Sequence, residues 1–328
     1  MTNICKGDLY HPKWRPNSSI LLAVERNIAK HPYKSKSMEN LLVLTDFSLH
    51  AKHAAEYAYS VAKKIGANLI LCNAVIVPAE MPQAGLVVWP MEESSVLEEA
   101  SSSELEKLKE HLKKIDESHD KKPQIGIVKQ SGYLQDVVNG LLADDLADLV
   151  VMGTHAEGFG SFIVGNHVRT MIEAVDVPLL LVPSKVKIAP FKNIYFASDL
   201  SDPHGDSAFL KQIIPLASAF KAEVFIAHIS TPASIADDIS QKTKAMILDF
   251  SSELGYPGIH FIRINEQNAV DGLNKLMAKA PMDLLVMVHR EKSFFKNLLK
   301  GSHTEKLTKD LDFPMLIFKA ESQPLHIA

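Results

Sequence analysis

The sequence predicts two tandem open doubly wound α/β domains, each built on a parallel sheet. Short apolar runs alternate with segments whose apolar residues recur at helical spacing. The runs are continuously apolar, which is typical of parallel strands covered on both faces. The whole pattern occurs twice, and 328 residues are enough for two such domains.

The internal repeat sets the expected domain boundaries. LLVLTDFS, which ends at Ser48, matches IYFASDLS, which ends at Ser201. ADLVVMGTH, which ends at His155, matches MDLLVMVHR, which ends at Arg290, and VPLLLV matches FPMLIF further on. We therefore expect an N-terminal extension over 1–37, a first domain over 38–185 and a second domain over 186–328.

Each domain reads as five strands separated by four helices. The apolar runs predict strands at 41–45, 68–75, 124–130, 149–152 and 179–182 in the first domain, and at 194–198, 223–229, 260–264, 284–288 and 315–318 in the second. Helical spacing predicts helices at 51–65, 96–115 and 166–174. The last strand of each domain is short and apolar, and an exposed edge of that kind favours pairing. We expect these two strands to pair and to join the domains as a pseudo-dimer, with a homodimer as a further option.

The extension over 1–37 differs in composition from the rest of the chain. It holds seven Lys and Arg against two acidic residues. We expect a basic, poorly ordered segment that is dispensable for folding. The alternative is a basic arm that contacts an acidic partner or phosphates.

Composition and motifs exclude several classes. With 46% apolar and 23% charged residues, the chain is neither disordered throughout nor a disulfide scaffold, and its net charge of −4 argues against a nucleic-acid partner. Two cysteines fit a reducing compartment. The absence of a long apolar run or secretory signal predicts a cytoplasmic protein without membrane contact. We find no metal-ligand, Walker or nucleophile-elbow motif, so we expect no enzyme and no catalytic residues, with weak ATP hydrolysis left open.

Candidate binding residues follow the first and fourth strands of the first domain. In doubly wound sheets, ligands bind beyond the carboxyl ends of the strands. Asp46 can accept hydrogen bonds from a sugar hydroxyl or a base amine, and Ser48 can cap the next helix. The alternative is that both residues only cap that helix. After the fourth strand, a glycine-rich turn leads to Gly165-Asn166 and a helix, a pattern typical of phosphate sites.

These residues resemble the universal stress protein family in its tandem form. Nucleotide-binding members carry Gly-x2-Gly-x9-Gly-Ser/Thr after the fourth strand and an Asp at the end of the first. The resemblance covers 38–320 and implies an adenine-nucleotide alpha-hydrolase-like fold and a role in stress response. It also implies ATP as the candidate ligand, with no metal beyond the Mg that accompanies ATP.

In the first domain the resemblance places two residues, Asp46 and Ala74, on the adenosine side. It places five along the phosphate loop: Met152, Gly153, His155, Gly165 and Asn166. Ala156 replaces the second glycine, and the loop is one residue shorter than the family spacing. We expect an altered nucleotide site here.

In the second domain the resemblance selects Asp199, Ile229, Gly301 and Ser302. Val288 and Glu291 replace the two loop glycines. A β-branched valine resists positive φ, and a glutamate repels a triphosphate. We therefore expect this domain not to bind ATP.

Two other functions remain open at this point. One is a nucleotide-independent protein-interaction module with the same fold. The other is an adenylate-forming or nucleotide-transferring enzyme. The enzyme needs catalytic His or Lys motifs near the first strand, and the segment from Asp46 to His50 supplies only one His, His50.

Overall fold

The computed structural model describes residues 38–76, 91–154, 166–198, 203–230, 255–267, 269–279, 281–290 and 313–320. The expected extension over 1–37 lies outside these residues. The described strands form one ten-stranded sheet in the order β3-β2-β1-β4-β5-β10-β9-β6-β7-β8. Their bounds are β1 Asn40–Leu44, β2 Asn68–Val75, β3 Ile125–Ser131, β4 Leu149–Thr154, β5 Leu179–Pro183, β6 Asn193–Ser198, β7 Glu223–Ser230, β8 Ile259–Asn265, β9 Leu284–His289 and β10 Met315–Lys319.

All ten predicted strands are confirmed to within about two residues at each end. They could be predicted because parallel strands buried on both faces leave long apolar runs. Helix α2 (Leu49–Ile65) begins two residues before the predicted start. Helix α3 (Met91–Ile115) begins five residues early, while α6 (Asn166–Ala174) matches its prediction.

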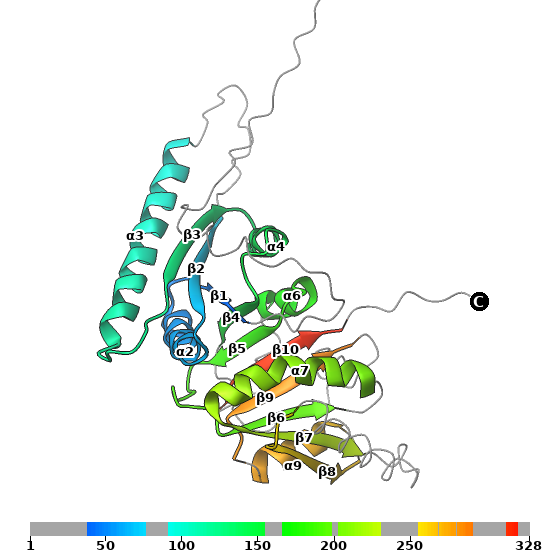
Figure 1. Cartoon of the computed structure of the whole chain (residues 1–328). Helices are drawn as coiled ribbons and strands as arrows, with labels where there is room; N and C mark the ends of the chain where they lie inside the picture. Colours follow the sequence, from blue (N-terminus) through cyan, green and yellow to red (C-terminus); the bar gives the residue numbers. More distant parts are fainter. Residues whose placement is uncertain are drawn as a thin grey trace, which may run out of the picture. The chain divides into compact units, whose positions relative to one another are not determined.

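The two halves of the sheet have the same strand order, counted from opposite ends, and meet at their last strands, as predicted. β5 pairs antiparallel with β10, with Leu180 opposite Leu316. The other strand pairs of the described sheet are parallel. Figure 1 shows β5 beside β10, with the strands of the first half beyond β5 and those of the second half beyond β10. The edge of each half is therefore covered by its counterpart.

Helices cover both faces of the sheet. One core cluster holds side chains from α2, α3 and α7 (Pro203–Phe220). The other holds side chains from α4 (Leu134–Ala143), α6 and α9 (Ala269–Lys279). In the first half, α3 and α2 lie on one side of the strands and α4 and α6 on the other (Figure 1). This is the layering expected of a doubly wound sheet.

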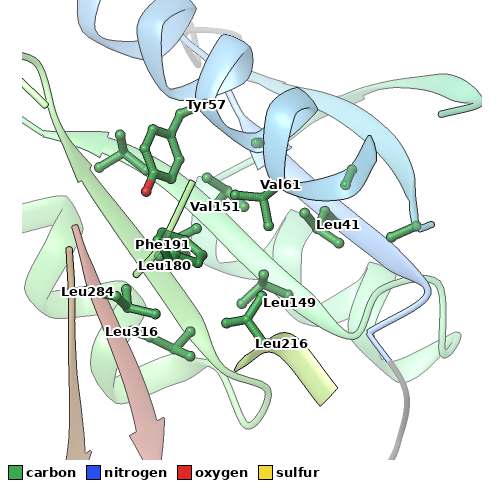
Figure 2. Close-up of a cluster of buried hydrophobic side chains, with 14 of the residues drawn as sticks. Leu41, Tyr57, Val61, Leu149, Val151, Leu180, Phe191, Leu216, Leu284 and Leu316 are labelled. Carbon is green, nitrogen blue, oxygen red and sulfur yellow. The ribbon is translucent and has the colours of Figure 1, made fainter. Parts of the chain in front are cut away.

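The first core cluster is continuous across both halves of the sheet. Figure 2 shows Leu180 close to Leu284 and Leu316, which come from strands of the second half. The fully buried Phe191, from the segment that joins the halves, packs between two aromatic rings. Its ring centroid is 6.2 Å from that of Tyr57 on α2 and 4.5 Å from that of Phe220 on α7. The joining segment is therefore part of the core.

The repeated aspartates Asp148 and Asp283 hold the amino ends of the first strands. Asp148 Oδ2 accepts hydrogen bonds from the backbone N–H groups of Glu39 and Asn40, both at 3.0 Å. In the second domain, Asp283 Oδ2 accepts hydrogen bonds from the equivalent backbone N–H groups, those of Lys192 at 2.8 Å and Asn193 at 2.9 Å. These repeated acids are structural, at the edge of the sheet opposite the candidate site.

Within the described residues, no helix is both long enough and apolar enough to cross a membrane.

Candidate functional site

The strand register brings three of the predicted site residues to one edge of the sheet. Leu44 of β1 lies opposite Cys72 of β2 and Met152 of β4. Asp46 follows β1 by two residues, Ala74 lies two residues beyond Cys72, and Gly153 follows Met152. The carboxyl ends of these three adjacent parallel strands are where a doubly wound sheet binds its ligand.

Asp46 lies in a tight turn between β1 and α2. Its Oδ1 accepts a hydrogen bond from the Ser48 backbone N–H at 3.0 Å. Phe47 adopts a positive φ of 64°, which is uncommon for a residue other than glycine. Ser48 caps α2, since its hydroxyl accepts from the Ala51 N–H at 3.2 Å. The predicted cap at Ser48 is confirmed, and the turn leaves the Asp46 side chain exposed.

The Asp46 carboxylate is held in its charged form. Partial burial opposes ionisation, but hydrogen bonds from Ser48 and the nearby His50 outweigh it and hold the pKa of Asp46 below its ordinary value. An exposed carboxylate with one oxygen already accepting from the turn keeps further lone pairs to accept from hydroxyl or amine donors.

Gly153 is required by close packing. A Cβ at this position would lie 2.5 Å from the His50 carbonyl oxygen and 3.1 Å from the Ala51 nitrogen, both in the first turn of α2. The helix that starts beside Asp46 therefore rests directly on the end of β4. The absence of a side chain at Gly153 sets the spacing between the end of β4 and the start of α2, which follows Asp46.

Sequence reasoning missed two polar residues, Asn73 and Ser101, whose side chains support the site edge. The Asn73 side-chain amide donates to the Thr45 carbonyl oxygen at 2.7 Å, and its Oδ1 accepts from the Ser101 hydroxyl of α3 at 2.8 Å. This bridge fixes the end of β1 to β2 and α3. Asn73 lies inside an otherwise apolar strand, and that exception was the available signal.

Several predicted site residues cannot be placed. His155, Gly165, Asp199, Gly301 and Ser302 lie outside the described residues. Asn166 is the first residue of α6, as predicted.

The second domain fills the equivalent positions with apolar side chains. Ile229 on β7 is 7% exposed, and Gly272 of α9 packs so tightly on it that a Cβ there would lie 2.4 Å from Ile229 Cγ2. Val288 is buried within β9. The expected obstacle of positive φ at this position is wrong. Among the described glycines positive φ occurs only at Gly66, Gly132 and Gly255, and both Gly153 and Val288 are ordinary strand residues.

A buried polar cluster lies at the same edge of the second domain, and sequence reasoning missed it. Asp206 of α7 is 1% exposed and accepts hydrogen bonds from the Ser198 hydroxyl and, at 2.6 Å, from the Arg290 guanidinium. His228 Nδ1 lies 3.2 Å from the Ser198 carbonyl oxygen.

This cluster contains Ser, His and Asp but is not a catalytic triad. The Ser198 hydroxyl donates to a carboxylate, whereas a nucleophilic serine must donate to an imidazole. The His228 contact instead repeats the Asn73 contact of the first domain, at the matching strand ends.

Metal and thiol chemistry find no support in the described parts of the chain. No group of three or more His, Cys, Asp or Glu side chains there could hold a metal ion. Cys72 is fully buried, and burial raises the pKa of its thiol to about 12, so the thiolate does not form near neutral pH.

Comparisons with known proteins agree with the fold. The model of the universal stress protein family matches residues 38–183 and 190–319. The chain therefore belongs to the universal stress protein family and carries two of its domains in tandem. A search of the curated proteins gives no match.

Solved structures share this architecture at low sequence identity. A universal stress protein from Archaeoglobus fulgidus DSM 4304 is 14% identical, with a TM-score of 0.62, over 85% of this chain and 98% of its own. A functionally unknown protein from Pseudomonas aeruginosa PAO1 is 13% identical, with a TM-score of 0.54, over 87% of this chain and 94% of its own. A universal stress protein solved in complex with cAMP covers 45% of this chain and 98% of its own, at 19% identity and a TM-score of 0.33.

Proposed function

We propose that the first domain, 38–185, binds an adenine nucleotide such as ATP, and that the second domain, 186–328, does not. The protein would act as a cytoplasmic stress-response protein in which only the first domain binds the nucleotide. The observation that carries this proposal is the convergence of Asp46, Ala74 and Gly153 on one edge of the sheet.

The first domain offers groups at that edge that suit the ribose and phosphate parts of a nucleotide. Asp46 is exposed and ionised, which suits ribose hydroxyls. Ala74 is small and only half-buried, so it leaves room beside the carboxylate. α6 begins at Asn166, and a helix N-terminus favours phosphate through its free N–H groups and its dipole.

At two of the matching positions the described part of the second domain carries larger apolar side chains. Ile229 replaces Ala74 and is packed beneath α9, and Val288 replaces Gly153 within a buried strand. Apolar side chains at both positions reduce the space and the hydrogen-bonding groups that a nucleotide would use.

Two measurements test the proposal. Mass spectrometry of the small molecules released on denaturing freshly purified protein should detect an adenine nucleotide. Calorimetric titration with ATP and Mg²⁺ should give one site per chain. A clean protein with no response to millimolar ATP would contradict the proposal.

One observation favours the alternative of a protein-interaction module. Five large apolar side chains of the first domain are exposed among the described residues: Leu49, Ile76, Val96, Leu97 and Tyr133. They follow β1, β2 and β3 or lie near the start of α3. Contiguous exposed apolar surface marks contact sites for partners. A failure to bind nucleotide would therefore shift the account toward a protein partner at this edge.

A further inference from the structure

Thr45 connects β1 to Asp46, and each of its polar groups is held. Its N–H donates to the Cys72 carbonyl oxygen at 2.9 Å, and its hydroxyl accepts from the Phe47 N–H at 3.0 Å. Its carbonyl oxygen accepts from the Asn73 side-chain amide at 2.7 Å. That carbonyl belongs to the planar peptide group between Thr45 and Asp46, so the Asn73 contact fixes the direction in which the chain leaves the sheet at Asp46.

Asn73 supports this turn from the face of the sheet opposite Ala74. Successive side chains of a strand point to opposite faces. Ala74 packs against the core cluster that includes α4 and α6, whereas Asn73 Oδ1 accepts from the Ser101 hydroxyl of α3 at 2.8 Å. Ser101 is 5% exposed, so this contact is part of the packing of α3 on the sheet. Asn73 therefore holds the turn without occupying the face on which Ala74 lies.

The Asn73 amide makes both contacts in one orientation only. Its Nδ2 must face the Thr45 carbonyl, because a carbonyl oxygen only accepts, and its Oδ1 must then face the Ser101 hydroxyl. Thr45 and Ser101 are buried and Asn73 is half-buried, so water competes weakly for these hydrogen bonds. The amide is thus a fixed link between α3 and the end of β1.

The second domain repeats the contact with a different residue. His228 lies opposite Ser198 in the strand register, and its Nδ1 lies 3.2 Å from the Ser198 carbonyl oxygen. Ser198 corresponds to Thr45 in the repeat. Histidine Nδ1 and asparagine Nδ2 are both bonded to Cγ, so either side chain can bring a nitrogen to the same carbonyl. The repeated contact indicates that this strand end uses a side-chain nitrogen and not asparagine in particular.

We propose that Asn73 is a positioning residue of the nucleotide site and orients Asp46 by holding the Thr45 carbonyl. Binding groups that are held by a supporting layer of hydrogen bonds keep their geometry more exactly than unsupported ones. Through Ser101, the packing of α3 and the direction of Asp46 are linked. The effect on nucleotide affinity rests on the proposed function, whereas the effect on the Asp46 turn does not.

The test compares Asn73→Leu with Asn68→Leu in the full chain. Asn68 is also half-buried on β2, and its amide donates to Asn40 Oδ1 of β1 at 3.3 Å. The two substitutions therefore remove side-chain hydrogen bonds between the same two strands at opposite edges of the sheet. Asn73→Leu should weaken ATP binding in calorimetric titration by roughly three- to tenfold, the worth of one hydrogen bond, and Asn68→Leu should leave it unchanged.

An NMR titration of the Asp46 carboxylate gives a second readout that needs no ligand. Burial raises the pKa of Asp46, but the hydrogen bonds from Ser48 and the nearby His50 outweigh it. A turn without its support weakens the Ser48 bonds, so the pKa of Asp46 should rise in Asn73→Leu and keep its wild-type value in Asn68→Leu. A general loss of stability would not move a pKa of the folded state.

Asn73→His copies the second domain and should restore both readouts, because its Nδ1 can donate to the Thr45 carbonyl. Unchanged readouts in Asn73→Leu would overturn the proposal, as would equal changes in Asn68→Leu or a failure of Asn73→His to restore them. If Asn73→Leu does not fold, Ser101→Ala takes its place, and an unchanged Asp46 pKa there would overturn the proposal. If the wild type binds no ATP, the proposed function fails, and the Asp46 titration alone decides this inference.

Discussion

Gly153→Ala adds one methyl group where the first turn of α2 rests on β4. The new Cβ would lie 2.5 Å from the His50 carbonyl oxygen and 2.8 Å from its carbonyl carbon. Ordinary carbon–oxygen contacts begin near 3.3 Å, so the helix start must move by about 0.8 Å or more. The obstacle is backbone, which cannot rotate away as a side chain can. Overpacking of this kind costs about 1–3 kcal/mol.

Urea unfolding measures this cost, with Gly140→Ala as the control. A Cβ at Gly140, inside α4, meets nothing within 4 Å. Alanine there should raise the free energy of unfolding by about 0.5–1 kcal/mol, because glycine is a poor helix former. Wild-type stability in Gly153→Ala would refute the close-approach reasoning. An equal loss in both variants would show that neither reports on α2.

Three further predictions concern the frame around the site. Lys319→Met should lower the free energy of unfolding in urea by about 0.5–1 kcal/mol. The reason is that Lys319 Nζ donates to the Glu173 carbonyl at 2.9 Å and to Asp176 at 2.8 Å, which connects β10 to the end of α6. An unchanged free energy of unfolding would show that these contacts do not stabilise the fold. The ion pair with Lys63 at 2.7 Å, aided by Ser118 and Tyr59, holds the pKa of Asp116 well below its ordinary value. Its folded pKa is thus below its unfolded pKa of about 3.9, so the stabilisation is present above that pH and is lost as pH falls through the folded value. Asp116→Asn should therefore be less stable than wild type at pH 7, with the gap narrowing below about pH 4, and a gap independent of pH would contradict this assignment. A chain that begins at Met38 should keep its Tm within about 2–4 °C of the full chain, and a larger fall or a loss of yield would make the extension part of a core.

The strands and their order along the chain were predictable because each strand leaves a local signal in the sequence. Apolar runs marked the strands, and the short apolar last strand of each domain indicated the pairing of β5 with β10. The role of Gly153 was not predictable, because it depends on how closely α2 approaches β4. Residues 199–202 and the phosphate-loop segments lie outside the described residues, so their predicted roles stay predictions.

The Asp206–Arg290 pair joins residues 84 positions apart, and neither position matches a known motif. Only a comparison of the two repeats gives a signal. The aligned residues of the first domain are His53 and His155, so two histidines stand where the second domain has an acid and a base. Opposite charges that appear together at aligned positions indicate a contact, but the direction of each side chain needs the fold.

Calorimetric titration with ATP and Mg²⁺ on wild type, Asp46→Asn and Asp199→Asn tests the central claim most directly. Asparagine at 46 keeps an oxygen to accept the Ser48 N–H, so the turn is preserved while the charge is lost. Hydrogen bonds to a charged group contribute about 1.5–3 kcal/mol, which predicts at least a tenfold loss of affinity in Asp46→Asn. Asp199→Asn should bind as wild type does, with one site per chain. Binding that survives Asp46→Asn and is lost in Asp199→Asn would place the nucleotide in the second domain and contradict the account.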